Sequence, residues 1–366
     1  MSNSYTNCSK RKRESKMKLS VLNLAPLREG QGFKEAMDDL VDLAQKVEGM
    51  GYERYWIAEH HNSKTIASSA TQLLIQRTLD QTKTIRVGSS GVMLPNHTPY
   101  IVAEQYGTLE TLYPNRVDLG LGRAPGTDQQ TARAIRRTDN LNPHFEEDIM
   151  ELQGYFADTL PVHAYPTAGL DVPLYILGSS TDSAHLAAKL GLPYVFAAHF
   201  APRMLMEAVA IYRREFKPSE TLADPYVILC ANVIMADTDE EAQRLATTQT
   251  MSFAGIVTNR AQKLQPPKES DEAVWEAILP SGEVPHFGPV AFSAQLSHTR
   301  IKQAVSQMTA CTFVGDKASV AAQIKAMQKQ VSFDELMAHS NIFDQEAQAH
   351  SYQLLADVVD QEFADE

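Results

Sequence analysis

A carboxylate and two imidazoles stand next to one another in the sequence as Glu59, His60 and His61. They follow a short apolar run, residues 54–58, that has the pattern of a buried strand. Because imidazole titrates close to neutral pH, a histidine here could donate or accept a proton. Half of a metal site and a structurally buried histidine are the alternatives. We expect no metal, because adjacent strand residues point to opposite faces and the sequence has no second cluster with ligand spacing.

Small side chains are concentrated further on, where Gly88, Ser89, Ser90 and Gly91 belong to a strand expected at residues 85–94. Small residues within a strand either let a ligand approach the backbone or let a neighbouring element pack closely. A flat ligand and tight packing therefore both remain open for this segment.

Two further segments could bind an anion. A strand expected at residues 117–121 leads into a glycine and then Arg123, and a strand at 174–177 leads into Ser179, Ser180 and Ser183. A guanidinium group, together with hydroxyl and amide groups at a helix start, suits a phosphate. Ordinary helix capping by serine is the alternative. The glycine spacing around Arg123 differs from a dinucleotide fingerprint, so that motif is weak.

The elements that must position these residues alternate between short apolar runs and helical periods, which predicts repeated βα units. The expected strands are residues 19–24, 54–58, 85–94, 117–121, 174–177, 194–198, 226–235 and 335–342. Eight such strands favour a closed (β/α)8 TIM barrel over an open doubly wound sheet. Residues 250–310 form an insertion between the seventh and eighth strands. Two interpretations of it are open, a lid over the substrate or a helical insertion packed outside the barrel.

Composition narrows the function classes. The chain has 366 residues, 33 Lys and Arg against 45 Asp and Glu, and a net charge of -12, so a nucleic-acid partner is not expected. Its three cysteines, Cys8, Cys230 and Cys311, show no metal or disulfide spacing, which fits a reducing cytoplasm. We expect residues 1–16 to be a disordered extension with no signal peptide or membrane span, and residues 17–366 to be one domain.

With these motifs in this order, the chain resembles the bacterial luciferase-like flavin monooxygenases, specifically the single-subunit branch similar to the luciferase alpha chain. The resemblance covers about residues 17–360. The segments that carry it are YWIAEHHN, IRVGSSGVMLPNHTPYIVAEQ, YPNRVDLGLGRAPGTD, LYILGSSTDSAHLAAKLGLPY and ELMAHSNIFDQEAQAHSYQLLA.

The resemblance implies roles for particular residues. It implies that His60 is the catalytic histidine that serves the flavin and oxygen chemistry, and that Ser90 and Gly91 form a non-proline cis peptide supporting the isoalloxazine ring. It assigns the flavin phosphate to Arg123, helped by Ser179, Ser180 and Ser183. Ser179 stands where the luciferase alpha chain has a glutamate.

The implied reaction uses reduced FMN and O2. Oxygen attacks the flavin C4a carbon, and the resulting C4a-peroxyflavin transfers oxygen to a small organic substrate. The cofactor carries this chemistry while the protein orients it and excludes water. Because no dinucleotide fingerprint is present, NAD(P)H would act through a separate flavin reductase. We expect an enzyme in the cytoplasm with no membrane partner.

Two other functions share the same sequence features. One is hydride transfer by the deazaflavin coenzyme F420, and the other is a flavin-binding protein without turnover. F420 carries a longer anionic tail, which would favour a basic surface that this acidic chain does not show. A homodimer is also expected, through the apolar side chains of the second and third helices, although packing on the barrel would explain most of these residues. They are Ile66, Leu73, Leu74, Ile75, Ile101 and Val102.

Overall fold

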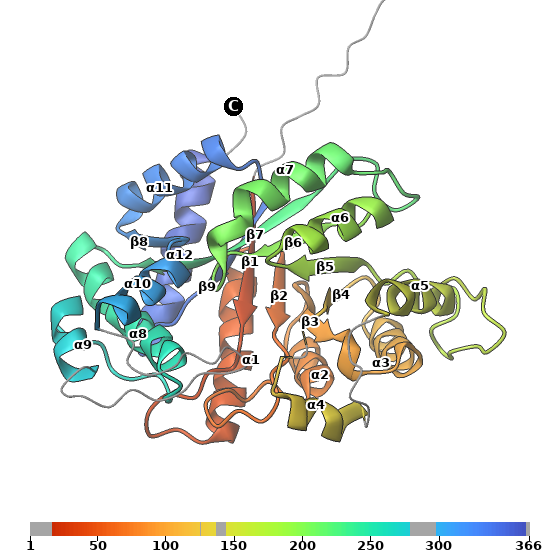
Figure 1. Cartoon of the computed structure of the whole chain (residues 1–366), viewed down its shortest axis with the longest axis horizontal. Coiled ribbons are helices and arrows are strands. Elements are labelled where there is room, and N and C mark those ends of the chain that lie inside the picture. Colours follow the sequence, from red (N-terminus) through yellow and green to blue (C-terminus); the bar gives the residue numbers. More distant parts are fainter. Residues whose placement is uncertain (1–16, 125, 137–143, 279–297, 364–366) are drawn as a thin grey trace, which may run out of the picture.

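Eight parallel strands close into a barrel in the computed structural model, which describes residues 17–124, 126–136, 144–278 and 298–363 (Figure 1). The barrel strands are β1 (Lys18–Asn23), β2 (Arg54–Ile57), β3 (Arg86–Met93), β4 (Val117–Gly122), β5 (Leu174–Gly178), β6 (Tyr194–Ala197), β7 (Val227–Met235) and β9 (Glu335–His339). Each pairs with the next in this order, and β9 closes the ring by pairing with β1. The predicted (β/α)8 TIM barrel is therefore confirmed.

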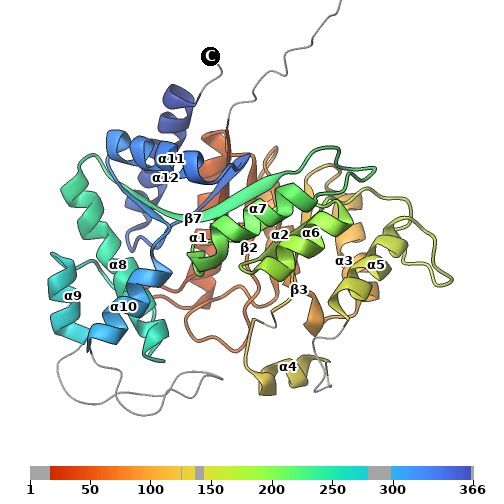
Figure 2. The ribbon, with the colours of Figure 1, turned by 45° about the horizontal axis from the view of Figure 1, so that its top comes forward.

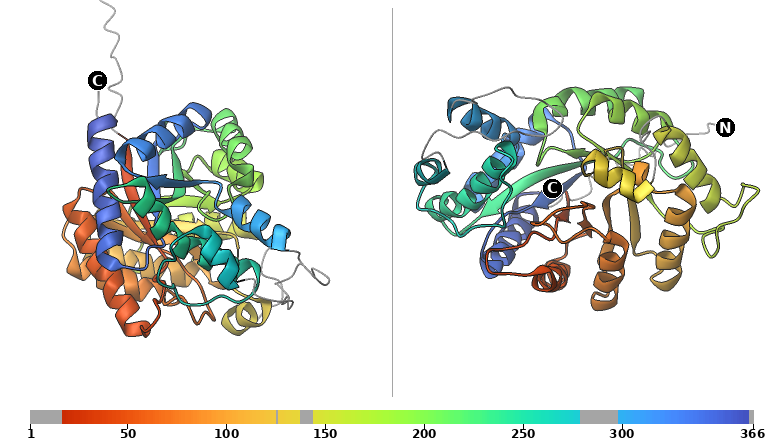
Figure 3. Two further views of the ribbon diagram at one scale, coloured as in Figure 1. Left: turned by 90° about the vertical axis from the view of Figure 1, so that its left-hand side faces the viewer. Right: turned by 60° about the horizontal axis from the view of Figure 1, so that its bottom comes forward.

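Helices lie around the outside of the strands, as the two views of Figure 3 show. They are α1 (Phe33–Gly49), α2 (Thr71–Gln81), α3 (Pro99–Leu112), α4 (Gln129–Arg136), α5 (Phe145–Phe156), α6 (Thr181–Leu190), α7 (Leu205–Glu215), α8 (Asp239–Val257), α9 (Asp271–Ile278), α10 (His298–Met308), α11 (Lys317–Gln330) and α12 (Gln345–Glu362). Two short 3-10 helices, Leu94–Asn96 and Pro202–Met204, precede α3 and α7.

Local sequence explains where several helices begin and end. In α1 the side chains of Leu40, Ala44 and Val47 recur at helical spacing and are buried, as the periodicity predicts. Gly51 follows this helix with a φ of +81°, a left-handed conformation that costs glycine little. The acidic start of α8 is capped by the hydroxyl of Thr238, which accepts a hydrogen bond from the Glu241 amide.

A ninth strand corrects the predicted organisation between the last two barrel strands. β8 (Thr312–Gly315) pairs with β7 from Asn232 to Met235, beyond the part of β7 that pairs with β6. The nine residues of β7 are long enough to serve both neighbours in turn. The sequence analysis missed β8 because a strand of four residues with alternating burial gives only a weak apolar signal.

The insertion expected at residues 250–310 is largely helical where the structure describes it, with an irregular segment at residues 258–270. It contains the end of α8, then α9 and α10, and these helices form a group beside the barrel in Figures 1 and 2. Their apolar contacts include Phe253, Ala254 and Val305. The described parts thus favour the helical insertion, while residues 279–297 lie outside the described residues.

The apolar core has two layers. A large cluster fills the space between strands and helices, and a smaller one fills the barrel itself. Where two members come from one segment of the chain they are two residues apart, as period-two patterning requires. The members are Leu22, Trp56, Ala58, Tyr175, Val195, Ile228, Cys230 and Met337.

Charged groups lie below this inner cluster, at the amino-terminal end of the barrel. The buried Arg54 guanidinium donates from Nε to Glu335 Oε1 at 2.7 Å and from Nη1 to Asp118 Oδ2 at 2.8 Å. Nη1 also donates to the Tyr175 hydroxyl at 2.9 Å. Both carboxylates are fully buried, so this network joins β2, β4 and β9 across the barrel floor.

The structure bears only in part on the predicted dimer face and on the prediction of no membrane span. Among the apolar residues considered for a dimer face, Leu74, Ile75 and Val102 are buried, whereas Leu73 and Ile101 are exposed. The homodimer stays a prediction. The extension at residues 1–16 lies outside the described residues, and among the helices that are described none combines the length and apolarity needed to cross a membrane.

Candidate active site

His60 follows β2 at the carboxyl-terminal end of the barrel, where TIM-barrel enzymes place their catalytic groups. Trp56 and Ala58 point into the barrel, and His60 continues this alternation by two residues. Its imidazole forms a hydrogen bond with the backbone of Gly126, in the segment after β4. Burial lowers the pKa of His60 below its usual value, although this hydrogen bond opposes the shift. The side chain is therefore neutral at neutral pH and able to accept a proton.

Two more histidines, which the sequence analysis did not select, lie near His60 at this end. The His199 ring, after β6, packs edge to face on the His339 ring of β9, with 5.6 Å between centroids. Burial lowers the pKa of His199 far below its usual value and that of His339 to about 4. His60 is also close enough to His199 to disfavour its charged form. Only closure of the barrel brings these three strand ends together.

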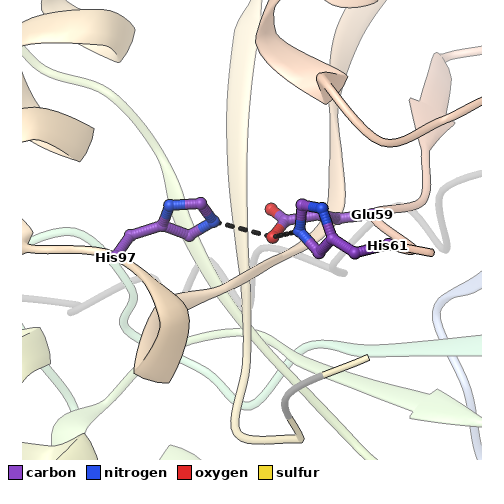
Figure 4. Close-up of side chains that lie close together, drawn as sticks. All are labelled: Glu59, His61 and His97. Carbon is purple, nitrogen blue, oxygen red and sulfur yellow. Dashed lines mark hydrogen bonds and ion pairs between the residues drawn. The ribbon is translucent and has the colours of Figure 1, made fainter. Parts of the chain in front are cut away.

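Glu59 and His61 meet a partner that the sequence analysis missed, His97 (Figure 4). Oε1 of the buried Glu59 lies 2.8 Å from His61 Nε2 and 2.7 Å from His97 Nε2. Burial would raise the pKa of Glu59, but the hydrogen bonds from both histidines outweigh it and the pKa is lowered. The carboxylate therefore ties the segment after β2 to the segment after β3.

The same three groups are also of the types that bind metal ions. Their ligand atoms all lie within 4.8 Å of one another. The expectation that the protein holds no metal accordingly remains a prediction. The hydrogen bonds by themselves account for the arrangement, because they satisfy the buried carboxylate.

Ser90 and Gly91 lie at an irregularity in the barrel wall. The pairing of β3 with β4 shifts register between Ser89 and Val92, and the Ser90–Gly91 peptide bond is cis, as the resemblance implies. Tight packing explains the glycine, because a Cβ at Gly91 would lie 2.7 Å from the Gly120 carbonyl oxygen. Bulges of this kind often occur next to active sites, where they redirect the chain.

Arg123 and the serines predicted to bind phosphate come together after β4 and β5. Arg123 Nη1 and Nη2 both lie 3.3 Å from Oδ2 of Asp182, in the first turn of α6. Ser180 is the N-cap residue of this helix, and its side chain makes no capping hydrogen bond. The first-turn amides and an exposed guanidinium thus share one location, which suits an anion.

Two details qualify the fit of a phosphate there. The Ser183 hydroxyl is buried and donates to the Ser180 carbonyl at 2.7 Å, so it already has a structural partner. Asp182 also forms an ion pair with the Arg123 guanidinium. This ion pair is weak because both side chains are largely exposed. A phosphate dianion can replace it, since it offers more acceptor oxygens to the same fork.

A cavity of about 610 Å³ lies at the other end of the barrel. It is lined by residues that precede strands, among them Pro173, Pro193 and Tyr226, and it also contacts Arg54. Because catalytic groups of this fold come from the carboxyl ends of strands, we do not assign the chemistry to this cavity.

Comparison with known proteins agrees with this geometry. The family model described as luciferase-like monooxygenase matches residues 17–333. A luciferase-like monooxygenase of Escherichia coli is 43% identical over 343 residues, which is 93% of this chain and 96% of the relative. YddN, an uncharacterized protein of Bacillus subtilis, is 45% identical over 352 residues, covering 95% and 97%. The crystal structure of apo-MsnO8 has a TM-score of 0.80 at 32% identity and covers 97% of this chain and all of that one.

More distant structures share the fold alone. The oxygenating constituent of 3,6-diketocamphane monooxygenase from Pseudomonas putida, in complex with FMN, has a TM-score of 0.65 at 17% identity and covers 95% of this chain and 98% of its own. An F420-dependent secondary alcohol dehydrogenase has a TM-score of 0.59 at 15% identity, covering 94% and 98%. The match over most of the chain and the close relatives decide the assignment: this chain belongs to the luciferase-like monooxygenase family.

Proposed function

We propose that the protein is a flavin-dependent monooxygenase that uses reduced FMN and O2 to oxygenate a small organic substrate. The observation that carries this proposal is the placement of the candidate residues. The candidate residues lie on or directly after four consecutive strands at one end of the barrel: His60 after β2, Ser90 and Gly91 within β3, Arg123 after β4 and Ser180 after β5. A flat ring with a phosphate tail can extend along such a row.

The residues present fit FMN in two respects. The α6 amino terminus and Arg123 provide an anion site at one end of the row, and Ser179 and Ser180 add hydroxyl groups there. At the other end, the register shift of β3 and its Ser90–Gly91 bond interrupt the regular barrel wall, where the resemblance places the flavin ring. Bound there, reduced FMN would supply the reducing equivalents with which O2 is activated.

The chain's own contribution is to position groups and move a proton. His60, held neutral by burial, accepts or returns a proton at its free ring nitrogen. The hydrogen bonds of Glu59 to His61 and His97 fix the two segments that flank His60 and the β3 irregularity.

We further propose a two-component system in the cytoplasm, in which a separate NAD(P)H:flavin reductase delivers the reduced flavin. The absence of a dinucleotide fingerprint in the sequence supports this proposal. With FMN, O2 and an oxidisable substrate present, NADH alone should then give no oxygenated product, whereas NADH with an FMN reductase should give it.

The decisive experiment is anaerobic titration of the purified chain with reduced FMN and, separately, with reduced F420. Each complex is then mixed rapidly with air-saturated buffer while absorbance is recorded. The proposal requires saturable binding of reduced FMN and an oxygen-dependent transient that precedes the spectrum of oxidised flavin. Preference for F420 without any transient would instead assign the protein to hydride transfer.

A further inference from the structure

Two buried amide side chains, Asn232 and Gln249, meet at Thr312, on the side of the barrel opposite β3. Asn232 is on β7, and β7 and β3 lie four strands apart in both directions around the eight-stranded ring, so they form opposite walls. Gln249 lies on α8, the helix that leads into the insertion. Asn232 is 0% exposed and Gln249 is 3% exposed. The proposed function uses neither residue.

The orientation of the Asn232 amide is fixed by its partners. Nδ2 donates to the His199 carbonyl oxygen at 2.8 Å and lies 3.3 Å from the Thr312 hydroxyl. Because a carbonyl oxygen only accepts hydrogen bonds, the amide nitrogen must face it and Oδ1 must point elsewhere. Gln249 Nε2 lies 3.2 Å from the same Thr312 hydroxyl, so the two amides converge on one point.

Polar atoms of these side chains remain without partners. Asn232 Oδ1, Gln249 Oε1 and His199 Nδ1 are buried, and none of them has a hydrogen-bond partner among the residues that the structure describes. An unpaired buried acceptor costs about 1–3 kcal/mol, and native structures rarely retain several close together. Asn232 Oδ1, whose identity the His199 carbonyl fixes, is thus an acceptor without a donor, and the neighbouring Gln249 amide also has one polar atom without a partner among the described residues, which together indicate that a ligand with hydrogen-bond donors binds there.

The two amides lie at the carboxyl-terminal end of the barrel, where β7 changes its neighbouring strand. The His199 amide makes the last ladder bond to β7, to the Cys230 carbonyl at 2.8 Å, and the Asn232 amide then bonds the Cys311 carbonyl at 3.1 Å. β7 therefore changes its neighbour from β6 to β8 between Cys230 and Asn232. Since Cys230 faces the barrel interior, Asn232 two residues later is on the same face, just above the apolar filling.

Aromatic rings lie near Asn232 and Gln249. Phe200, next to His199, is 46% exposed, and its ring lies 6.3 Å from the ring of Phe253 on α8. The imidazoles of His199 and His339 are held neutral by burial. Uncharged acceptors beside apolar rings match a neutral donor group better than a cation, because an ammonium ion would lose its hydration without gaining a counter-charge.

We propose that Asn232 and Gln249 bind the hydrogen-bond-donating group of the substrate. The substrate class is thus a small uncharged molecule that has an amide N–H or hydroxyl group next to an apolar part. This inference rests on the proposed function, because the bound molecule is a substrate only if it is oxygenated at the same end of the barrel.

The test uses a matched pair of probes, benzamide and N,N-dimethylbenzamide, which differ in the amide N–H groups. Their binding to the full chain, with and without FMN, is measured by calorimetry. Benzamide should bind about tenfold more tightly, as expected for one or two hydrogen bonds to otherwise unpaired acceptors. Equal affinities, or no saturable binding of benzamide, would overturn the proposal, and this comparison requires no variant to fold.

A variant tests whether benzamide binds at the two amides. Gln249→Met keeps the length of the side chain but removes its acceptor, and it should abolish most of the preference for benzamide. Gln353→Met, at an exposed position of α12, is the control and should preserve it. A preference unchanged in Gln249→Met would show that the probe binds elsewhere and would refute the assignment.

The amide site and the proposed function can fail separately. Probe binding needs neither oxygen nor reduced flavin. A chain that prefers benzamide but does not bind reduced FMN would refute the monooxygenase and leave the amide site standing. A chain that shows the oxygen-dependent transient without any preference between the probes would do the reverse.

Discussion

The two ends of the barrel both bury polar side chains, but they use them differently. At the amino-terminal end, Arg54 bonds Glu335, Asp118 and Tyr175, so opposite charges and donors compensate one another. At the carboxyl-terminal end, Asn232 and Gln249 each keep one buried acceptor without a partner among the described residues. The first arrangement is complete without a ligand, whereas the second one is not.

This difference separates a structural end from a functional end. Taking Arg54 and its carboxylates out of water is costly, and only the mutual contacts offset that cost, so the network tolerates no missing member. The carboxyl end instead holds its histidines neutral and leaves acceptors unpaired, which costs stability but prepares the site for a ligand. Substitutions should accordingly affect folding at one end and binding or turnover at the other.

The largest effect is expected at the structural end. Arg54→Met leaves Asp118 and Glu335 buried with less compensation and should lower the free energy of unfolding by about 3–5 kcal/mol. Urea denaturation followed by circular dichroism measures this. Arg77→Met, which removes an exposed ion pair with Asp38, is the control and should change stability by less than about 1 kcal/mol. A loss as small as the control's would mean that the floor network does not stabilise the fold.

The next effect concerns pH at the functional end. His339 has a pKa of about 4 in the folded chain, against an ordinary value of 6.5. The unfolded chain thus binds a proton that the folded chain does not between these values, and stability falls as pH decreases from 6.5 to 4. The loss should be on the order of 3 kcal/mol for this residue. Urea midpoints across this range measure it.

A variant isolates that contribution. His339→Gln should flatten the pH dependence, although His199 adds to it in the same direction. His185→Gln removes an exposed ion pair on α6 and should change the pH dependence much less. If the stability of the parent chain were independent of pH below 6.5, the buried neutral state of His339 would be wrong.

His60 should matter for turnover but not for folding or flavin binding. His60→Ala removes the proposed proton carrier and should reduce turnover about a hundredfold, as is typical when general acid–base catalysis is lost. Titration with reduced FMN should give nearly the same dissociation constant. The exposed His163→Ala variant serves as the control. Unchanged turnover in His60→Ala would remove this residue from the catalytic role.

Arg123 should affect flavin affinity alone. Arg123→Ala removes charge-assisted hydrogen bonds to the phosphate and should weaken FMN binding about thirtyfold, or about 2 kcal/mol. Folding should be unaffected, because the pair with Asp182 is exposed. Arg214→Ala on α7 controls for the general loss of a positive charge. An unaltered dissociation constant would contradict the phosphate assignment.

The sequence predicted the repeating architecture well because that information is local. Apolar periods in α1 and in the barrel strands mark the buried face of each element, whatever its neighbours are. The weaker elements were missed for the same reason. β8 buries two of its four residues and α4 buries Ala132, so each shows too few apolar positions to be distinguished from a loop.

The sequence by itself determined the barrel, the placement of Glu59, His60 and Arg123 at strand ends, and the family resemblance. Tertiary structure alone decided which side chains meet. His97 joins Glu59 from a segment 38 positions away, and Thr312 lies between Asn232 and Gln249 from 80 and 63 positions away. Such contacts depend on the closure and register of the barrel, which no local pattern encodes. The sequence thus identified the candidate residues on and after β2 to β5, whereas the fold was needed to find Asn232 on the opposite strand, β7.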